Sequence, residues 1–318
     1  MSTIDPRNLG TSLEEATARF RFASDRRMES GNATDLPRTP LFHYTSEKAF
    51  ESIIATEQFW FSSIYHMDDK EELNFGFDVC GSVLRSFFER ADKIVKLFIE
   101  PLISTGFREE IRSIVEFYSI SFGTRNDPEQ WSRYGGNSKG VAIGLTPNFF
   151  RLTAPEDPKP EEKVFVGRVA YGEKAAKARH QRVVQSVTDF IKREYRLGSI
   201  PNGETAQALF RRLTAEMYVE VLWNCVTTKS ANWKRQNETR LLVLNRIKDP
   251  QLPVHSDRGR PYVKIPEPTL KQSLSEILLG PDAERDTEAT VRSFLAQRGL
   301  NNVGVTRTRR PTPSTSRL

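Results

Sequence analysis

Short apolar runs alternate with polar segments along the first third of the chain, and they predict strand–helix–strand order. Residues 41–44 are expected to form a short buried strand that runs directly into a helix with an apolar face over residues 49–54. Ser46 has the residue type and the position of an N-cap for that helix. Residues 59–63 are expected to form a second strand, because aromatic residues favour a half-buried pleated surface.

The strongest periodic signal in the chain predicts one long helix after Asp68 and Asp69, whose carboxylates suit a helix start. Apolar residues recur there at helical spacing and form a single stripe, which is typical of a core helix. The residues of the stripe are Leu73, Phe77, Cys80, Leu84, Phe87, Phe88, Ala91, Val95 and Phe98.

Two further strands are expected over residues 116–123 and 139–145, and we predict that they are neighbours in one sheet. In the first, apolar and serine positions alternate, which indicates one buried face. A short helix opened by Asp127 and carrying Trp131 and Tyr134 separates the two strands.

The second half of the chain predicts helices first and strands afterwards. Two amphipathic helices are expected within residues 174–226, and Asp282 is expected to cap a last helix that ends at Gly299. The remaining expected segments are an exposed loop over 153–163, strands over 163–171, 238–244 and 262–265, and a strand or short helix over 274–279.

These elements predict an α+β fold with six to eight short strands and helices grouped in blocks. No regular βαβ alternation, G-x-G-x-x-G sequence or P-loop occurs, which disfavours Rossmann and P-loop proteins. We expect one domain over residues 38–280, with helical insertions at about 72–115 and 174–226. Residues 1–37 are expected to form a flexible extension with a short helix over 13–22, and residues 281–318 a C-terminal helix followed by a disordered basic tail.

The composition is that of an ordinary globular protein, with 37% hydrophobic and 28% charged residues. The chain has no run of 18 apolar residues, so no membrane-spanning helix is expected. Its N-terminal segment lacks the apolar stretch of a signal peptide, so secretion by that route is not expected. Cys80 and Cys225 are the only cysteines, which favours a reducing, cytoplasmic compartment and leaves open delivery into another cell. The four histidines show no metal-ligand spacing, so no metal is expected.

The net charge of +6 conceals a strong asymmetry along the chain. Residues 174–318 hold 26 Lys and Arg against 14 Asp and Glu, whereas residues 38–173 hold 16 against 21. A basic half favours an anionic partner such as nucleic acid, a dinucleotide or an acidic protein. Solvated helix faces and a loose tail explain the same excess equally well.

Polar residues at two distant strand ends carry the candidate chemistry. His43 and Thr45 stand at the first strand-to-helix corner, and Glu238 and Arg240 share one face of a late strand. A purely structural interpretation remains open for both pairs. His43 and Thr45 would then only satisfy backbone groups at the corner, and Glu238 and Arg240 would form an ion pair at a strand edge.

The order of these motifs resembles that of an uncharacterised bacterial domain family over residues 40–280. Members of the family open with His-Tyr-Thr, which is His43-Tyr44-Thr45 here. They carry a Trp-x-x-Tyr-Gly block with a following Lys-Gly, which corresponds to Trp131 to Gly135 with Lys139-Gly140. They also have a late Glu-x-Arg strand, which corresponds to Glu238 and Arg240. The chain has Asp68 where the family usually has Asn, and Lys70 where Pro is common. These departures put a site role for Asp69 in doubt.

That family in turn resembles the ADP-ribosyltransferase superfamily, which includes DNA-modifying toxins and tRNA 2′-phosphotransferases. The looser resemblance implies a split mixed sheet with inserted and flanking helices, and NAD as co-substrate. It implies an NAD-dependent ADP-ribosyltransferase that modifies a nucleic acid or a protein, with a toxin or anti-phage defence effector as a setting.

The resemblance also implies roles for individual residues. Glu238 would be the catalytic carboxylate that stabilises positive charge on the ribose, and His43 would bond a ribose hydroxyl. The cofactor-binding set would be His43, Tyr44, Thr45, Phe61, Ser63 and Tyr65. Arg240, Trp131 and Tyr134 would face the substrate, although the two aromatic residues suit a core position as well.

Two other functions remain open from the sequence. One is a catalytically inactive relative that binds nucleic acid or a partner through the basic C-terminal half. The other is a different enzyme on a related fold, such as an RNA-modifying one. Neither the modified target nor the oligomeric state follows from the sequence.

Overall fold

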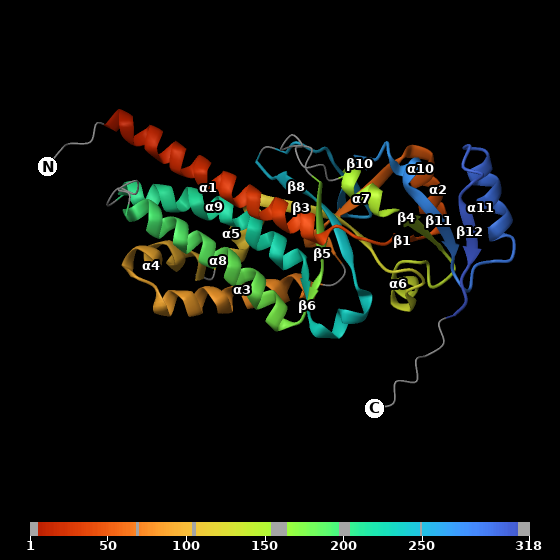
Figure 1. Ribbon diagram of the computed structural model, residues 1–318, viewed down its shortest axis with the longest axis horizontal. Coiled ribbons are helices and arrows are strands. Elements are labelled where there is room, and N and C mark those ends of the chain that lie inside the picture. The colour runs from red at the N-terminus through yellow and green to blue at the C-terminus, as the bar shows by residue number, and fades with distance from the viewer. Residues whose placement is uncertain are drawn as a thin grey trace, which may run out of the picture.

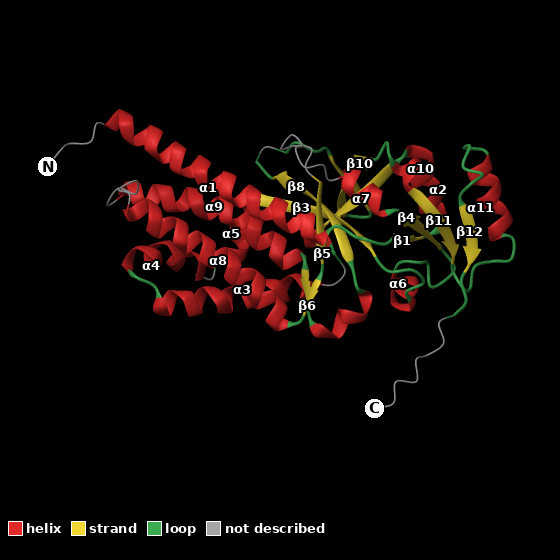
Figure 2. Ribbon diagram, in the orientation of Figure 1, coloured by secondary structure: helices red, strands yellow, loops and turns green. Residues whose placement is uncertain are grey.

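At one end of the molecule gather the helices α1 (Pro6–Asp35), α3 (Lys70–Arg90), α4 (Lys93–Ile99), α5 (Phe107–Ile114), α8 (Glu173–Arg196) and α9 (Glu204–Val226), and the strands lie in the rest of it together with short helices (Figures 1 and 2). The structure is a computed structural model of the 318-residue chain. It describes residues 6–67, 70–103, 106–153, 164–196, 204–248 and 250–310. The expected α+β class is confirmed.

A six-stranded antiparallel sheet forms the centre of the fold. Strand β3 lies in its interior between β8 and β2, because both of its edges are paired. The strand order is β5 (Val164–Arg168), β8 (Thr239–Arg246), β3 (Val115–Phe122), β2 (Gln58–Ser63), β10 (Arg260–Pro266) and β9 (Val254–Asp257).

A second sheet of four strands adjoins the first. Its order is β1 (Leu41–Thr45), β4 (Val141–Leu145), β11 (Leu274–Leu279) and β12 (Gly304–Arg307), and a separate short pair is formed by β6 (Ala170–Tyr171) and β7 (Thr228–Lys229). The two larger sheets meet where Phe42 and Gly123 exchange backbone N–H···O bonds of 2.9 Å in both directions.

The prediction that the third and fourth strands are neighbours is wrong. Strand β4 pairs with β1 and β11 in the smaller sheet, whereas β3 belongs to the larger one. Every residue of β4 is buried, so this strand requires a partner on each side. Helix α6 (Pro128–Arg133) and the tight turn ending at Gly140 carry the chain from one sheet to the other. A Cβ at Gly140 would lie 2.2 Å from the Thr45 carbonyl oxygen, so this close approach requires glycine.

Two hydrophobic cores lie on opposite faces of the six-stranded sheet. The first joins the β5–β8–β3 half, through Phe165, Leu242 and Phe117, to a layer of helices. Those helices are α1, α3, α4, α5, α8 and α9. The second core joins the other face to the four-stranded sheet and to α2 (Glu47–Thr56), α7 (Pro147–Thr153), α10 (Leu270–Ser273) and α11 (Thr287–Ala296).

The single long helix expected from the apolar stripe is two helices. The chain breaks between α3 and α4, and Asp92 begins the second by accepting a hydrogen bond from Val95 N (3.3 Å). Residues 68 and 69, the expected caps of the first, lie outside the described residues. Ser46 does cap α2, as expected, with its hydroxyl 3.2 Å from Ala49 N.

The two chain ends are more ordered than the sequence predicts. Instead of a short helix in a flexible extension, α1 runs from Pro6 to Asp35 along the helical layer (Figure 1). Its Phe20 packs against Phe190 on α8, and Arg27 pairs with Glu220 on α9 (2.6 Å). These long-range partners hold the helix in place and could not be recognised from local sequence.

At the other end, the residue expected to cap the last helix is engaged elsewhere. Residue Asp286 precedes α11, whereas Asp282 pairs with Arg310 (2.9 Å). Part of the expected disordered tail, through Arg307, forms β12, and residues 311–318 lie outside the described part. The expected strand over 163–171 is divided into β5 and β6, and nearly all of the expected loop over 153–163 is outside the described residues. No helix in the described ranges has the length and hydropathy needed to cross a membrane.

A buried carboxylate lies between α7 and the end of β10. Glu267 accepts a hydrogen bond from the Thr153 hydroxyl (2.9 Å), while its second carboxylate oxygen has no hydrogen-bond partner among the described residues. Burial raises the pKa of Glu267 to about 7, and the Thr153 bond opposes this only in part. Because the folded state holds the proton more tightly than the unfolded state, stability falls as pH rises from about 4.5 to about 7.

We expect Glu267→Gln to remove this pH dependence. The variant should gain up to about 3 kcal/mol relative to the wild type at pH 8 and little at pH 5, because the amide carries no charge to desolvate. Urea unfolding followed by circular dichroism at both pH values measures the difference. An equal effect of the substitution at pH 5 and pH 8 would contradict the prediction.

Candidate functional site

Glu238, the predicted catalytic carboxylate, lies at the start of β8 in a buried cluster of polar side chains. It is 2% exposed. Asn237 before it adopts a left-handed conformation (φ 39°), which turns the chain from the short helix η4 (Ala231–Gln236) into the strand. The Glu238 N–H donates to the hydroxyl of Tyr171 (2.8 Å). The carboxylate is therefore fixed at the backbone as well as through its oxygens.

Three side chains from three elements donate to the Glu238 carboxylate. Lys229 Nζ on β7 lies 2.6 Å from Oε2, and Arg240 Nε on β8 lies 2.7 Å from Oε1. The Ser121 hydroxyl on β3 also donates to Oε1. Lys229 bonds Gln236 Oε1 as well (2.8 Å), and Arg240 donates to the Val226 carbonyl (2.5 Å). We name these residues, Glu238, Lys229, Arg240 and Ser121, the Glu238 cluster.

The cluster keeps its carboxylate ionised. Burial raises the pKa of Glu238, but the charges of Arg240 and Lys229 outweigh this effect and hold the pKa well below its usual range. A carboxylate with a lowered pKa stabilises the fold above the unfolded pKa, near 4.5, and this contribution is lost as pH falls through the folded-state value. The cluster is therefore a fixed ion pair network at neutral pH, not a proton donor.

His43, the other predicted catalytic residue, is half-buried on β1. Its Nδ1 lies 3.1 Å from the Ser121 carbonyl oxygen, which only accepts, so Nδ1 carries the proton. The ring packs edge-on against Phe59 (5.6 Å between centroids) and at a tilt against Phe122 (5.7 Å). Burial lowers the pKa of His43 to about 4, so the imidazole is neutral at physiological pH.

Ser121 brings His43 and Glu238 near each other, but on opposite sides of β3. Side chains alternate along a strand, so Ser121 faces the helical layer while Phe122 faces the second core. Glu238 bonds the Ser121 hydroxyl, whereas the His43 ring packs on Phe122. A small cavity of 360 Å³ lies beside the cluster and is lined by the residues that flank Glu238, Asn237 and Thr239; neither His43 nor Glu238 lines it.

Two other predicted site residues, Tyr44 and Trp131, form a small aromatic core behind β1. The rings pack edge to face at 4.8 Å. The Tyr44 hydroxyl donates to the Thr124 carbonyl and accepts from Asp127 N (2.8 Å), which fixes the start of α6. The Trp131 ring nitrogen donates to Asn126 Oδ1 (3.0 Å). Both residues hold the connection from β3 to β4, and neither contacts the Glu238 cluster through these bonds.

The remaining predicted residues are spread over the molecule. Phe61 is fully buried in the second core, and Thr45 ends β1 in a half-buried position. Ser63 donates to Glu116, and the Tyr65 hydroxyl donates to the Val115 carbonyl (3.0 Å). Tyr134 is 44% exposed. Of the predicted set, the structure therefore brings together His43, Glu238 and Arg240.

Sequence reasoning missed Ser121 and Lys229. The serine was visible as part of the polar side of an alternating strand, but that side was expected to face solvent, and the helical layer covers it instead. Lys229 follows two threonines after α9 with no local feature that sets it apart. It is 3% exposed, and only the tertiary contact with Glu238 explains a buried lysine.

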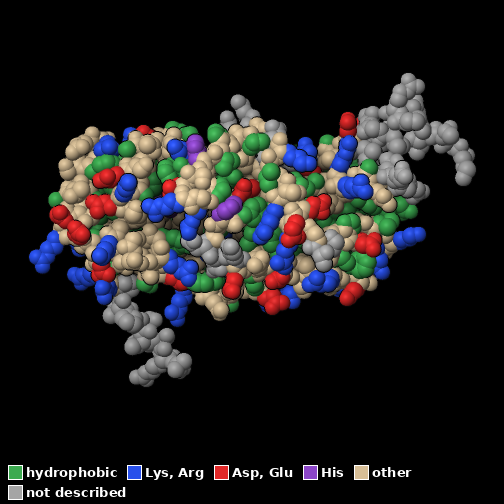
Figure 3. All heavy atoms as spheres, turned by 180° about the vertical axis from the view of Figure 1, so that it is seen from behind, with side chains coloured by type: hydrophobic (Ala, Val, Ile, Leu, Met, Phe, Trp, Pro, Cys, Tyr) green, Lys and Arg blue, Asp and Glu red, His purple; other side chains and the backbone are tan. Residues whose placement is uncertain are grey.

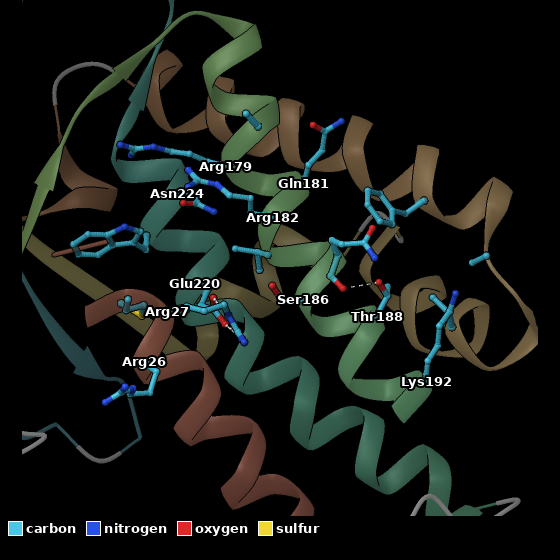
Figure 4. A pocket seen from close by; sticks show the side chains of 18 of the residues that line it. Arg26, Arg27, Arg179, Gln181, Arg182, Ser186, Thr188, Lys192, Glu220 and Asn224 are labelled. Carbon is cyan, nitrogen blue, oxygen red and sulfur yellow. Dashed lines mark hydrogen bonds and ion pairs between the residues drawn. The ribbon is translucent and has the colours of Figure 1, made fainter. Parts of the chain in front are cut away.

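A much larger opening lies among the helices. It is a groove of 1340 Å³ whose walls come from α1, α3, α4, α8 and α9 (Figure 4). Six basic side chains line it, Arg26, Arg27, Arg90, Arg179, Arg182 and Lys192, against two carboxylates, Asp35 and Glu220. We call this opening the arginine groove.

Both carboxylates of the arginine groove are already engaged by protein groups. Glu220 accepts from Arg27 (2.6 Å) and from Ser24 (2.6 Å). Asp35 accepts from the backbone N–H of Arg168 (2.9 Å) and lies 3.7 Å from Arg179. Burial raises the pKa of Asp35 and lowers that of Arg179. Among the lining side chains, six cations stand against two carboxylates, and one of the cations, Lys192, pairs with Asp92 (3.3 Å).

Some donors of the groove point into it without a protein acceptor. Arg182 on α8 forms no hydrogen bond or ion pair with the described residues. The amide nitrogen of Asn224 on α9 is buried and likewise finds no acceptor there. Figure 4 shows Arg179, Arg182 and Asn224 together at one end of the groove, with Lys192 further along α8. Arg182 is exposed, so solvent reaches its donors, whereas the buried Asn224 amide is satisfied only by a ligand or a bound water.

The face of the molecule opposite to that of Figure 1 carries no continuous basic patch. On the side opposite to that of Figure 1, Lys and Arg side chains alternate with Asp and Glu (Figure 3). No cluster of three or more His, Cys, Asp or Glu side chains that suits a metal ion occurs in the described ranges.

Comparison with known proteins gives one match. A family model described as "Protein of unknown function (DUF2971)" matches residues 130–241, about a third of the chain. The matched segment holds Trp131, Lys229, Glu238 and Arg240 and excludes His43. No curated protein and no solved structure matches the chain. The expected similarity to a family without an assigned function is supported over this segment, and the match carries no link to ADP-ribosyltransferases.

The Glu238 cluster makes a prediction about stability. We expect Lys229→Met to lower the free energy of unfolding by about 3–5 kcal/mol, because the substitution leaves the buried carboxylate without one of its two cations. The matched control is Lys192→Met, which removes an ion pair to Asp92 (3.3 Å) between half-exposed side chains and should cost less than about 1 kcal/mol. Urea unfolding at pH 7 compares them, and equal losses would show that the buried network is not stabilising.

Proposed function

We propose that the protein binds a phosphate-bearing ligand in the arginine groove. The observation that supports this most is the imbalance of charge inside the groove: six cations line it against two carboxylates. Arg27 and Arg179 pair with those carboxylates and Lys192 pairs with Asp92, which leaves Arg26, Arg90 and Arg182 as the cations in excess. A cavity with walls of low polarisability and one sign of charge concentrates counter-ions of the opposite sign. Three of the six cations, Arg179, Arg182 and Lys192, come from the basic second half of the chain.

The donor types favour phosphate over other anions. Arginine guanidinium groups present paired N–H donors that match two phosphate oxygens, and Arg182 has no competing protein acceptor in the described structure. Asn224 adds a neutral donor at the same end. Apolar side chains, among them Met28, Phe87 and Trp223, supply surface for a non-phosphate part of the ligand. The volume exceeds that of a typical small-molecule pocket, so a nucleotide fits the groove by size.

The test measures binding of ATP and of inorganic tripolyphosphate by isothermal titration calorimetry, with the change in tryptophan fluorescence that is lost in Trp223→Phe as a second signal. We expect Arg182→Glu to weaken ATP binding at least about tenfold, because it replaces a charge-assisted donor by a like charge. Asn224→Leu should weaken it by a smaller factor. Arg211→Glu is the control, since Arg211 is an exposed arginine of α9 outside the groove. No binding of either probe, or equal losses in Arg182→Glu and Arg211→Glu, would refute the proposal.

A second candidate is the NAD-dependent ADP-ribosyltransferase implied by sequence resemblance. The proximity of His43 and Glu238, joined through Ser121, favours it, as does the meeting of two sheets beside β1. The residues do not fit NAD as they are arranged. Glu238 already has three protein donors, and Phe61 and Tyr44 lie in packed cores. Activity would require that the Glu238 carboxylate exchange a protein partner for a ribose hydroxyl, with a nucleic acid or a protein as target.

The enzymatic candidate is tested by nicotinamide release from NAD, with and without cell lysate and nucleic acid. If it holds, the wild type releases nicotinamide and labels a macromolecule, and Glu238→Gln abolishes both while circular dichroism shows a folded protein. His43→Asn, which retains a donor for the Ser121 carbonyl, should lower the rate. Absence of release by the wild type with every target offered rejects the candidate and leaves ligand binding in the groove unaffected.

A further inference from the structure

An open face of the six-stranded sheet carries a row of stacked aromatic rings. Trp60 on β2 and Tyr262 on β10 stack at 4.3 Å with an angle of 15° between their planes. His255 on β9 continues the stack on the other side of Tyr262, at 5.4 Å and 29°. We call these three residues the aromatic row. It crosses three neighbouring strands: His255 is the direct cross-strand partner of Tyr262, and Trp60 is its diagonal neighbour on β2.

Because side chains alternate along a strand, the aromatic row lies on the same face of the sheet as the helical layer, over outer strands that this layer does not cover. Phe59, Phe61 and Val263 face the second core, so Trp60 and Tyr262 point the opposite way. The helical layer contacts β5, β8 and β3 through the first core, which includes no residue of β2, β10 or β9. Trp60 is accordingly 45% exposed, an unusual position for the largest apolar side chain.

Cationic side chains accompany the row. Lys264 Nζ lies 5.6 Å from the centroid of the Trp60 ring, and Lys264 is the cross-strand partner of Trp60. The hairpin that joins β9 to β10 turns at Arg258 and Gly259, both with positive φ (48° and 77°), and Arg260 follows. This tight two-residue turn closes the hairpin just beyond the Arg260–Asp257 pair, two residues along the strands from Tyr262 and His255. Asp257 is the one acidic residue of the described hairpin from 254 to 266.

We propose that this face binds single-stranded nucleic acid. Trp60 is 45% exposed and offers a stacking surface for a base, and Lys264 beside it supplies a cation for a neighbouring phosphate. Aromatic stacking combined with nearby cations is the chemistry by which sheets hold unpaired strands, and it needs no base-specific contact. A duplex is disfavoured because its bases are already stacked on each other.

The lysine next to Trp60 favours single-stranded nucleic acid over an apolar protein as the partner of the aromatic row. A hydrophobic interface excludes charge from its centre, whereas here lysine lies directly over the most exposed ring. The row is also narrow, three rings wide, which suits one strand of bases better than a broad contact. The site is distinct from the arginine groove, because none of its residues lines that groove.

The experiment measures fluorescence anisotropy of labelled single-stranded RNA and DNA of about 12 nucleotides, of mixed sequence, with the matching duplex as competitor. We expect Trp60→Ala and Trp60→Leu to weaken single-strand binding about tenfold or more. The leucine variant keeps an apolar strand residue and loses the ring, so it separates stacking from folding. Lys264→Ala should lower the slope of log affinity against log salt by about one.

Matched controls separate this site from other parts of the protein. Tyr195→Ala removes a ring of similar exposure, 46%, from α8 and should leave affinity unchanged. Arg211→Glu, at an exposed position of α9 outside the arginine groove, should also leave it unchanged. A loss in Arg182→Glu as large as that in Trp60→Ala, with none in Arg211→Glu, would instead assign nucleic-acid binding to the arginine groove and overturn the proposal. Equal affinity of the wild type and folded Trp60→Leu, or no binding of single strands by the wild type, overturns it as well.

Discussion

The buried Glu238 carboxylate is the constraint on which the centre of the molecule depends. An ion in the interior is tolerated only when opposite charges and donors reach it, and here Lys229, Arg240 and Ser121 do so from β7, β8 and β3. Because Arg240 also bonds the Val226 carbonyl, the same network ties the end of α9 to the sheet. One carboxylate thus fixes the relative position of the helical layer and the six-stranded sheet, which is a structural role whatever chemistry accompanies it.

The helical layer carries the cluster of basic side chains, and the six-stranded sheet carries the exposed aromatic surface. The helices enclose the arginine groove, where paired carboxylates leave an excess of positive charge. The sheet side leaves the aromatic row uncovered at its outer strands. Both features favour ligands with phosphate groups, but through different interactions. The arginine groove offers charge-assisted hydrogen bonds in a partly enclosed space, and the aromatic row offers stacking on an open surface. The opposite placement of His43 and Glu238 around β3 gives the catalytic hypothesis weaker geometric support.

Local patterns determined most of the elements. The alternation before Gly123, the apolar face after Ser46 and the apolar stripe of α8 correspond to the observed strand and helices, since burial of one face leaves a period in the sequence. Helix α9 forms where a helix was expected, but it is not amphipathic as predicted, because Glu216 to Val226 are buried on every side. The sequence also pointed to His43, Glu238 and Arg240 as a group, and these do lie close to Ser121. It failed at β4, because strand order depends on which edges remain open after the chain has turned, and no local signal records that.

Tertiary structure decided the rest, for reasons of burial and long-range pairing. Whether Glu238 lies in a cleft or in an ion network depends on Lys229 and Ser121, which are separated from each other by more than one hundred residues and meet only in the fold. The arginine groove likewise exists because α1 packs on α9 through Arg27 and Glu220. The order of residues along the chain determined by itself that the protein is α+β and basic in its second half. Where that charge is concentrated, and which aromatic rings face solvent, followed from packing, because exposure is a property of neighbours and not of residue type.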